Sequence, residues 1–217
     1  MGIIKRGILG GVSNKIGNVV GSSWKGIATL RTLPLSVANP RTLAQRNNRS
    51  TFSLMSKLGS EVLPTVCQPL WNRDAKQMSG FNAYVMENKK AFDANPVEWV
   101  LNPIMSKGSL SADLFVATLS ADHGSINCIF AQALSNPQDS ADDVAYIQLI
   151  HMDNKNPADP AYHAKGFVTN AKRSTGTVDI PRYFAVNAGD KLIVSLSFKS
   201  ADGREVATSS TQVITIS

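Results

Sequence analysis

Few residues of this chain have the type and spacing of a catalytic site. Gly21 and Gly26 have the spacing of a GxxxxGK loop, in which backbone N–H groups and a lysine hold phosphate groups. Ile27 follows where that loop needs its lysine, and the dinucleotide pattern GxGxxG is missing from the stretch GILGGVSNKIGNVVGSSWKG. We therefore expect no phosphate site and no cofactor here. No GxSxG, HExxH or paired catalytic carboxylates occur either, so we expect no enzyme.

Two further groups of residues could hold a metal ion. The histidines show no pairing at metal-ligand spacing, so we expect side chains at the surface or the rim of the fold: His123, His151 and His163. The stretch SNPQDSADD contains three carboxylates that could hold Ca²⁺: Asp139, Asp142 and Asp143. It lacks the alternation and the distal glutamate of an EF-hand loop, so a solvated acidic loop between strands is the favoured interpretation. We expect no metal site.

The two cysteines, Cys67 and Cys128, form no disulfide framework, and we expect two free, buried thiols. The chain is therefore expected to be made in a reducing cytoplasm. No apolar run approaches the ~18 residues of a spanning helix, so we expect no membrane partner. Lys5 and Arg6 resemble the start of a signal peptide, but glycines and polar residues interrupt the apolar run that should follow.

Charge is distributed unevenly along the chain. The first 60 residues carry nine basic side chains and no acidic one, whereas the other 157 carry 13 basic and 16 acidic residues. Such a basic segment suits docking on an anionic surface. The candidate docking and assembly residues, with Trp24 as the expected buried contact, are Lys5, Arg6, Lys15, Trp24, Lys25, Arg31, Arg41, Arg46 and Arg49.

The N-terminal part is expected to form two regions. Residues 1–35 are a glycine-rich basic segment whose β-leaning runs, 16–20 and 27–33, predict a β-hairpin or extended β arm. Because two short strands are marginal in water, this arm must pack on the rest of the chain or on another chain. Residues 36–96 are expected to be helical.

Caps and breakers define the predicted helical hairpin. Asn39-Pro40 is a start signal for a helix. The residues that should share one face of this helix, at spacings of three and four, are Ala44, Asn48, Phe52, Met55, Leu58 and Val62. Pro64 is expected to end this helix, with a break as far as Pro69. Ser79 should cap a second helix with one face at Phe81, Tyr84, Val85 and Phe92.

Residues 97–217 are expected to be all-β. The predicted strands are 98–105, 110–119, 125–134, 144–152, 163–170, 177–180, 191–199 and 205–216, with Asp202-Gly203 supplying the positive φ angles of a tight hairpin. Seven or eight short strands over this length are typical of an immunoglobulin-like β-sandwich. The expected fold class is therefore α+β: a glycine-rich β arm and helical hairpin followed by an immunoglobulin-like sandwich.

The opening sequence also matches a family pattern, G-x-x-G-x-x-S-x-K-x-G-x-V-x-G-x-x-W-K-G, with an arginine before a proline. The matching residues are Gly7, Gly10, Ser13, Lys15, Gly17, Val19, Gly21, Trp24, Lys25, Gly26, Arg31 and Pro34. The opening of the chain therefore resembles the start of a family of proteins of unassigned function from Bacteroidota and their phages. The similarity continues more loosely through Gln45, Arg49, Phe52 and the stretch SGFNAYVMENKKAF.

The resemblance implies a structural component of a phage virion. We expect a non-enzymatic head-fibre or capsid accessory subunit that docks through its basic N-terminal region, assembles with itself and with capsid proteins, and projects the sandwich outwards. One alternative is a nucleic-acid-binding module that uses the same basic segment, with Arg46 and Arg49 on one helix face. Another is a surface protein that binds carbohydrate or a host through Tyr162, Tyr183 and Phe184.

Overall fold

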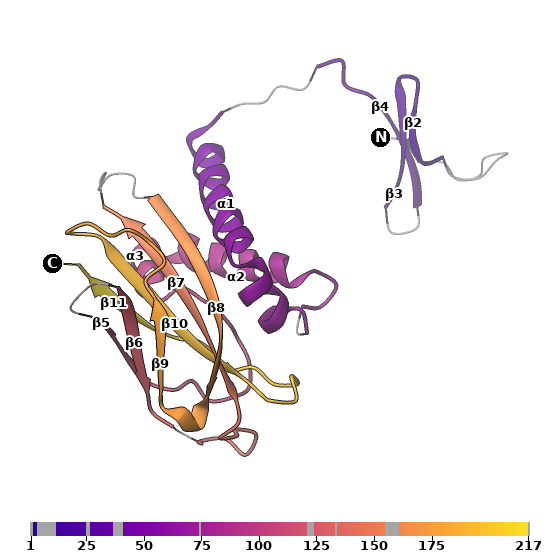
Figure 1. Ribbon diagram of the computed structural model, residues 1–217. Coiled ribbons are helices and arrows are strands. Elements are labelled where there is room, and N and C mark those ends of the chain that lie inside the picture. The colour runs from indigo at the N-terminus through magenta and orange to yellow at the C-terminus, as the bar shows by residue number, and fades with distance from the viewer. Residues whose placement is uncertain are drawn as a thin grey trace. The chain divides into compact units, whose positions relative to one another are not determined.

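The chain divides into two compact units, residues 1–43 and 44–217. The computed structural model describes residues 2–3, 12–24, 27–36, 41–73, 75–120, 124–132, 134–154 and 161–216. Within them the fold is α+β, with an N-terminal sheet, four helices and two further antiparallel sheets (Figure 1). The predicted helical segment and the predicted β region lie in the same compact unit. Whether the three predicted domains fold independently stays a prediction.

The N-terminal sheet is a meander of three strands with a short fourth strand at its edge. Its order is β1-β4-β3-β2, from Gly2–Ile3 (β1), Asn14–Ile16 (β2), Val19–Trp24 (β3) and Ile27–Thr32 (β4). The hairpin prediction is confirmed in the pairing of β3 with β4. The predicted run 16–20 instead spans the turn between β2 and β3, where Gly17 has a φ of +57°. Glycine adopts such a positive φ without strain, so it suits this turn.

Four helices form one layer of the second unit: Leu43–Glu61 (α1), Leu63–Trp71 (η1), Gly80–Ala94 (α2) and Pro96–Leu101 (α3). The predicted break between Pro64 and Pro69 is wrong, because this segment is a π-helix. Pro64 lies in its first turn, where no N–H donor is needed. The wide turn buries Val66, Cys67, Leu70 and Trp71 in the core. The predicted cap of α2 is confirmed, since Ser79 Oγ accepts a hydrogen bond from the Asn82 N–H at 3.3 Å.

The predicted strand 98–105 is also wrong, because α3 occupies its first part. Asn95 caps α3 by accepting a hydrogen bond from the Glu98 N–H at 3.2 Å, and Pro96 follows in the first turn. A cap residue followed by proline favours helix over strand at this point. Trp99 is then buried on the inner side of the short helix.

Two antiparallel sheets complete the second unit. The four-stranded sheet has the order β11-β10-β7-β8, and the three-stranded sheet has the order β5-β6-β9. Their strands are Phe115–Leu119 (β5), Ser125–Phe130 (β6), Val144–Asp153 (β7), Ala161–Lys172 (β8), Thr177–Pro181 (β9), Lys191–Lys199 (β10) and Ser210–Thr215 (β11), with a 3₁₀ turn at Arg173–Thr175. These strands match seven of the predicted strand regions, and β10 has the predicted bounds.

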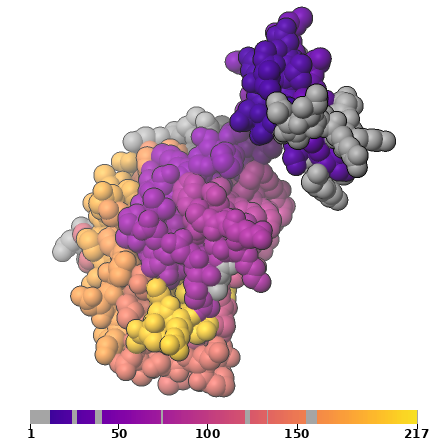
Figure 2. Space-filling model, turned by 90° about the vertical axis from the view of Figure 1, so that its right-hand side faces the viewer, coloured from indigo at the N-terminus to yellow at the C-terminus, as the bar shows by residue number. Residues whose placement is uncertain are grey.

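The four-stranded sheet lies between the helices and the three-stranded sheet. Along β7, Tyr146 and Ile150 join the core formed with the helices, whereas Ile147 and Leu149 join the core between the sheets. Figure 1 shows this order of layers within the unit. In Figure 2 the helical layer (purple) borders the C-terminal segment (yellow). An ion pair of 3.3 Å between Arg73 and Glu205 connects the residues after η1 to the segment between β10 and β11.

The fully buried side chain of Asn88 in α2 connects the helical layer through four hydrogen bonds. Its Nδ2 donates to the carbonyl oxygens of Tyr84 and Ile104, at 3.1 and 2.7 Å. Its Oδ1 accepts from the indole N–H of Trp99 at 2.9 Å and from the Ile104 N–H at 3.0 Å. One side chain therefore fixes α2, α3 and the segment that leads from the helices into the sheets.

We expect Asn88→Ala to lower the free energy of unfolding by about 2–4 kcal/mol, because it leaves buried donors and acceptors without partners. Urea unfolding followed by circular dichroism measures this loss. Asn48→Ala, at an exposed position of α1, is the matched control and should change stability by less than about 0.5 kcal/mol. Equal stability of the two variants would contradict the anchoring role of Asn88.

Candidate functional site

The N-terminal sheet has two chemically different faces. The register places Lys15, Val20 and Arg31 in one row across β2, β3 and β4. Directly paired residues share a face, so the two predicted docking residues lie on one side of the sheet, both exposed. The opposite face carries Ile16 and Val19, which are 60% and 38% exposed. The sheet thus presents Lys15 and Arg31 on one side, which also carries the exposed Ile27, and Ile16 with Val19 on the other.

This sheet has no apolar core of its own among the side chains that the structure describes. Of its residues whose burial the structure describes, only Gly21 and Thr29 are buried. Neither hydrophobic core cluster found among the described residues includes a residue of this sheet. Gly21 is covered because the backbone of Val12 crosses it, and a Cβ there would come within 2.1 Å of the Val12 carbonyl oxygen.

The first half of α1 is exposed on every side. All eight residues from 43 to 50 are exposed, and the helix becomes buried only from Thr51 onwards. Of the residues predicted to share one helix face, Met55, Leu58 and Val62 are therefore buried, whereas Ala44, Asn48 and Phe52 are exposed. An exposed helix surface of this kind is accessible to another molecule.

The structure brings the predicted docking residues together in two pairs. Lys15 and Arg31 share a face of the N-terminal sheet, and Arg46 and Arg49 share a face of α1 at a spacing of three residues. Arg41 is exposed just before that helix. The remaining predictions lie outside the described residues, or outside the described side chains for Trp24: Lys5, Arg6, Trp24 and Lys25.

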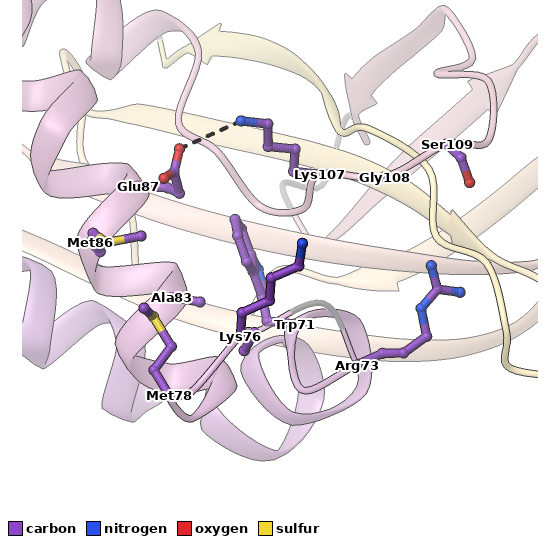
Figure 3. A pocket seen from close by; sticks show the side chains of 11 residues that line it. Trp71, Arg73, Lys76, Met78, Ala83, Met86, Glu87, Lys107, Gly108 and Ser109 are labelled. Carbon is purple, nitrogen blue, oxygen red and sulfur yellow. Dashed lines mark ion pairs between the residues drawn. The ribbon is translucent and has the colours of Figure 1, made fainter.

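A surface groove lies between α2, the end of η1 and residues 107–109, with a volume of about 520 Å³. In Figure 3, Met78, Ala83 and Met86 line one side of it and Trp71 lies at its back. Arg73, Lys76 and Lys107 surround its mouth, with Glu87 beside Lys107. Sequence reasoning missed this groove, because its residues come from segments that are far apart and share no local pattern.

Close backbone contacts hold the wall of the groove at residues 107–109. A Cβ on Gly108 would lie 1.9 Å from the carbonyl oxygen of Val206, so only glycine fits there. Thr208 Oγ1 donates to the Gly108 carbonyl oxygen at 3.1 Å. On the inner side, the indole N–H of Trp71 donates to the carbonyl oxygen of Met105 at 2.7 Å. This wall is therefore fixed to both the helices and the sheet.

The predicted solvated acidic loop is wrong for two of its three carboxylates. Asp139 and Asp143 turn inwards around Arg173, a fully buried side chain, together with Asp113. Arg173 Nη1 donates to Asp113 Oδ1 at 2.7 Å. Asp142 remains outside, 2.8 Å from Lys172 Nζ. No local pattern indicates this network, because Arg173 lies 30 residues beyond Asp143. The one guanidinium forms ion pairs with all three carboxylates inside the fold, so the network is structural.

Burial and charge act in opposite directions in this network. Burial raises the pKa of Asp113 to about 6; Arg173 opposes the rise, and the carboxylates of Asp139 and Asp143 add to it. Burial also works to raise the pKa of Asp139, but N–H groups of Asn136 and Ser111 overcome it and hold that pKa below its usual range. The pKa of Asp113 therefore lies above the usual range of a carboxyl group, whereas the pKa of Asp139 lies below it.

His151 is not at the surface or rim, which corrects that prediction. It is 6% exposed, and its Nε2 lies 2.9 Å from Asp190 Oδ2. Its ring stacks on Phe184 at 5.4 Å between centroids. Burial works to raise the pKa of Asp190, but the N–H groups of Asn187 and Asn154, together with His151, lower it to about 2. This pair fixes the turn before β10 against the end of β7.

The other candidate residues have ordinary structural surroundings. His163 is half exposed, and its Nδ1 lies 3.5 Å from Glu61 Oε1, so it is at the rim as predicted. His123 lies outside the described residues.

Both cysteines, Cys67 and Cys128, are free and buried, so the prediction of buried thiols is confirmed. Burial raises the pKa of each thiol to about 12. Of the three aromatic residues proposed for glycan binding, Tyr183 is exposed, Phe184 is half-buried, and Tyr162 is buried in the helix-facing core.

The described residues contain no group of three or more histidine, cysteine or acidic side chains that could hold a metal ion. In the same part of the chain, no helix is long and apolar enough to cross a membrane.

Comparison with known families matches residues 10–212 to a family of unknown function, DUF6266. No curated protein matches the chain.

The raised pKa of Asp113 makes stability depend on pH. Because the folded carboxyl holds its proton more tightly than the ordinary value of 3.8 allows, its contribution to stability is complete below about pH 4 and is lost as the pH rises through about 6. We expect Asp113→Asn to flatten the fall in the urea midpoint between pH 4 and pH 7. Asp142→Asn, at the exposed ion pair, is the control and should keep the wild-type slope. Parallel curves for Asp113→Asn and wild type would refute this assignment.

Proposed function

The chain belongs to DUF6266, a family of unknown function, and from that premise we propose that it is a non-enzymatic structural protein that assembles through its N-terminal unit. The observation that carries the proposal is the N-terminal sheet, whose described side chains form no apolar core yet expose Ile16 and Val19 on one face. Small sheets need a second packed layer to be stable in water. A second copy of the same sheet, packed through the aliphatic face, supplies that layer.

The basic residues support a second contact, with an acidic partner surface. Lys15 and Arg31 lie on the face opposite to Ile16 and Val19, so self-association through the aliphatic face leaves them accessible. Arg46 and Arg49 add positive charge on the exposed half of α1. Complementary charge of this kind steers partners into register and speeds their association.

For the second unit we propose an immunoglobulin-like sandwich. Numbered from one to seven along the chain, strands β5 to β11 form a 1-2-5 sheet and a 7-6-3-4 sheet with a shared core. An antibody constant domain has the fourth strand beside the fifth instead, so this arrangement moves one edge strand to the opposite sheet. Such sandwiches commonly serve as projecting modules, which fits an anchored protein with an outward domain.

We further propose that the assembly is a phage virion, in which the protein is a head-fibre or capsid accessory subunit. The support is the resemblance of the glycine-rich opening to proteins of Bacteroidota phages. An acidic capsid lattice would provide the partner surface for the basic residues, and the sandwich would project away from it.

The self-association proposal predicts that the full chain is oligomeric at about 100 µM and dissociates on dilution. Replacing Ile16 and Val19 together by serine removes the aliphatic face and should give a monomer, measured by light scattering after size-exclusion chromatography. The matched control replaces Val97 and Leu101, exposed aliphatic residues of α3, by serine and should leave the oligomer intact. A monomeric wild type, or equal dissociation of the control, would remove the proposal.

The charge proposal predicts that labelled poly-L-glutamate binds the chain at low salt. Charge reversal of Lys15, Arg31, Arg46 and Arg49 to glutamate should weaken binding by at least about tenfold, because these contacts are electrostatic. Lys165→Glu with Lys172→Glu, on β8, is the control for a general change of charge. Binding of duplex DNA that is much tighter than that of poly-L-glutamate, with a steep salt dependence, would favour the nucleic-acid-binding alternative instead.

A further inference from the structure

The groove beside Trp71 has an apolar interior whose one indole donor is already used. The Trp71 N–H is bonded to the Met105 carbonyl oxygen, and the ring is only 6% exposed. Met78 and Met86 are the large apolar lining residues that are most exposed among those described, at 40% and 37%. Methionine side chains are flexible and polarisable, so they adapt to apolar groups of different shapes. The interior is therefore suited to an apolar side chain.

The mouth of the groove has more positive than negative charge among the described residues. Glu87 already lies 3.2 Å from Lys90 Nζ and 3.7 Å from Lys107 Nζ, so two lysines share one carboxylate. Glu205 is engaged by Arg73 at 3.3 Å and by the hydroxyl of Ser109. No carboxylate among the described residues forms an ion pair with Lys76, which projects at the mouth (Figure 3). Added carboxylates would therefore find cations in excess on either side of the apolar interior.

From this combination we infer that the groove binds an acidic peptide segment of a partner protein, with one apolar side chain between flanking carboxylates. The apolar side chain packs against Met78 and Met86, and the carboxylates contact Lys76 and Lys107. The volume of about 520 Å³ is within the usual range for binding pockets and accommodates such a side chain. A nucleic acid fits less well, because Trp71 is too deeply buried to stack on a base. The inference is independent of assembly through the N-terminal sheet.

The probe for this site is a fluorescein-labelled peptide of sequence EDDFLDDE, measured by fluorescence anisotropy with the full chain. Lys76→Glu with Lys107→Glu should weaken its binding by at least about tenfold, since attraction becomes repulsion at the mouth. Lys165→Glu with Lys172→Glu makes the same change of net charge on β8 and should leave the affinity within about twofold. Circular dichroism and urea midpoints confirm that each variant is folded.

The apolar contact is tested separately. Peptide EDDGSDDE, which lacks the apolar pair, should bind at least about tenfold more weakly, because the groove interior then stays empty. In a chain labelled at its methionine methyl groups, EDDFLDDE should shift the signals of Met78 and Met86, while the signal of Met55, in the buried core, stays unchanged.

Three binding results would overturn the inference. The first is that EDDFLDDE does not bind at about 1 mM, a concentration at which even a weak complex forms. The second is an equal loss of affinity in the β8 control, and the third is equal binding of the two peptides. A change of oligomeric state in the Lys76 and Lys107 variant would also overturn it, because it would mean that a second copy of the chain occupies the groove. Failure of these tests leaves the self-association experiment unaffected, since none of the residues changed in that experiment lines the groove.

Discussion

The second unit is organised by the burial of β7 and β10 on both faces. Ile147 and Leu149 face the three-stranded sheet, whereas Tyr146 and Ile150 face the helices. A strand pair that is apolar on both sides needs two covering layers, and burial of this surface is the main favourable contribution to folding. The helices therefore belong to the same compact unit as the sheets. A buried hydrogen bond from Gln148 Nε2 to the hydroxyl of Tyr84, at 2.7 Å, fixes the register of the helical layer on the sheet.

The N-terminal sheet is the counterexample within the same chain. It has regular pairing and a glycine turn, but its described side chains include no buried apolar residue. Backbone pairing alone contributes little net stability, because the unfolded strands bond equally well to water. The contrast between a unit with two cores and a sheet whose described side chains form none is the physical basis for assigning assembly to the N-terminal sheet. The groove beside Trp71, by contrast, is built on the well-packed unit, so its shape does not depend on assembly.

Sequence reasoning succeeded where local patterns decide the structure. The strand at residues 191–199 and the cap at Ser79 both follow from local sequence, and both predictions are confirmed. Asn95 and Pro96 carried the same kind of local start signal, but the apolar run that follows them was assigned to a strand. The π-helix could not be predicted, because burial against β8 and α2 overrides the two prolines. The environments of Arg173 and His151 depend on partners at least 30 residues away, which periodicity and spacing do not reveal.

The central claim is that the N-terminal sheet becomes stable only when another copy covers it. Hydrogen exchange of its backbone amides, measured at several protein concentrations, tests this most directly, since protection reports local stability. The account predicts that amides of β3 and β4 exchange rapidly in dilute solution and become protected as the concentration rises, while those of β7 and β10 stay protected throughout. Strong protection of β3 and β4 at every concentration would contradict the account, because the sheet would then be stable within a single chain.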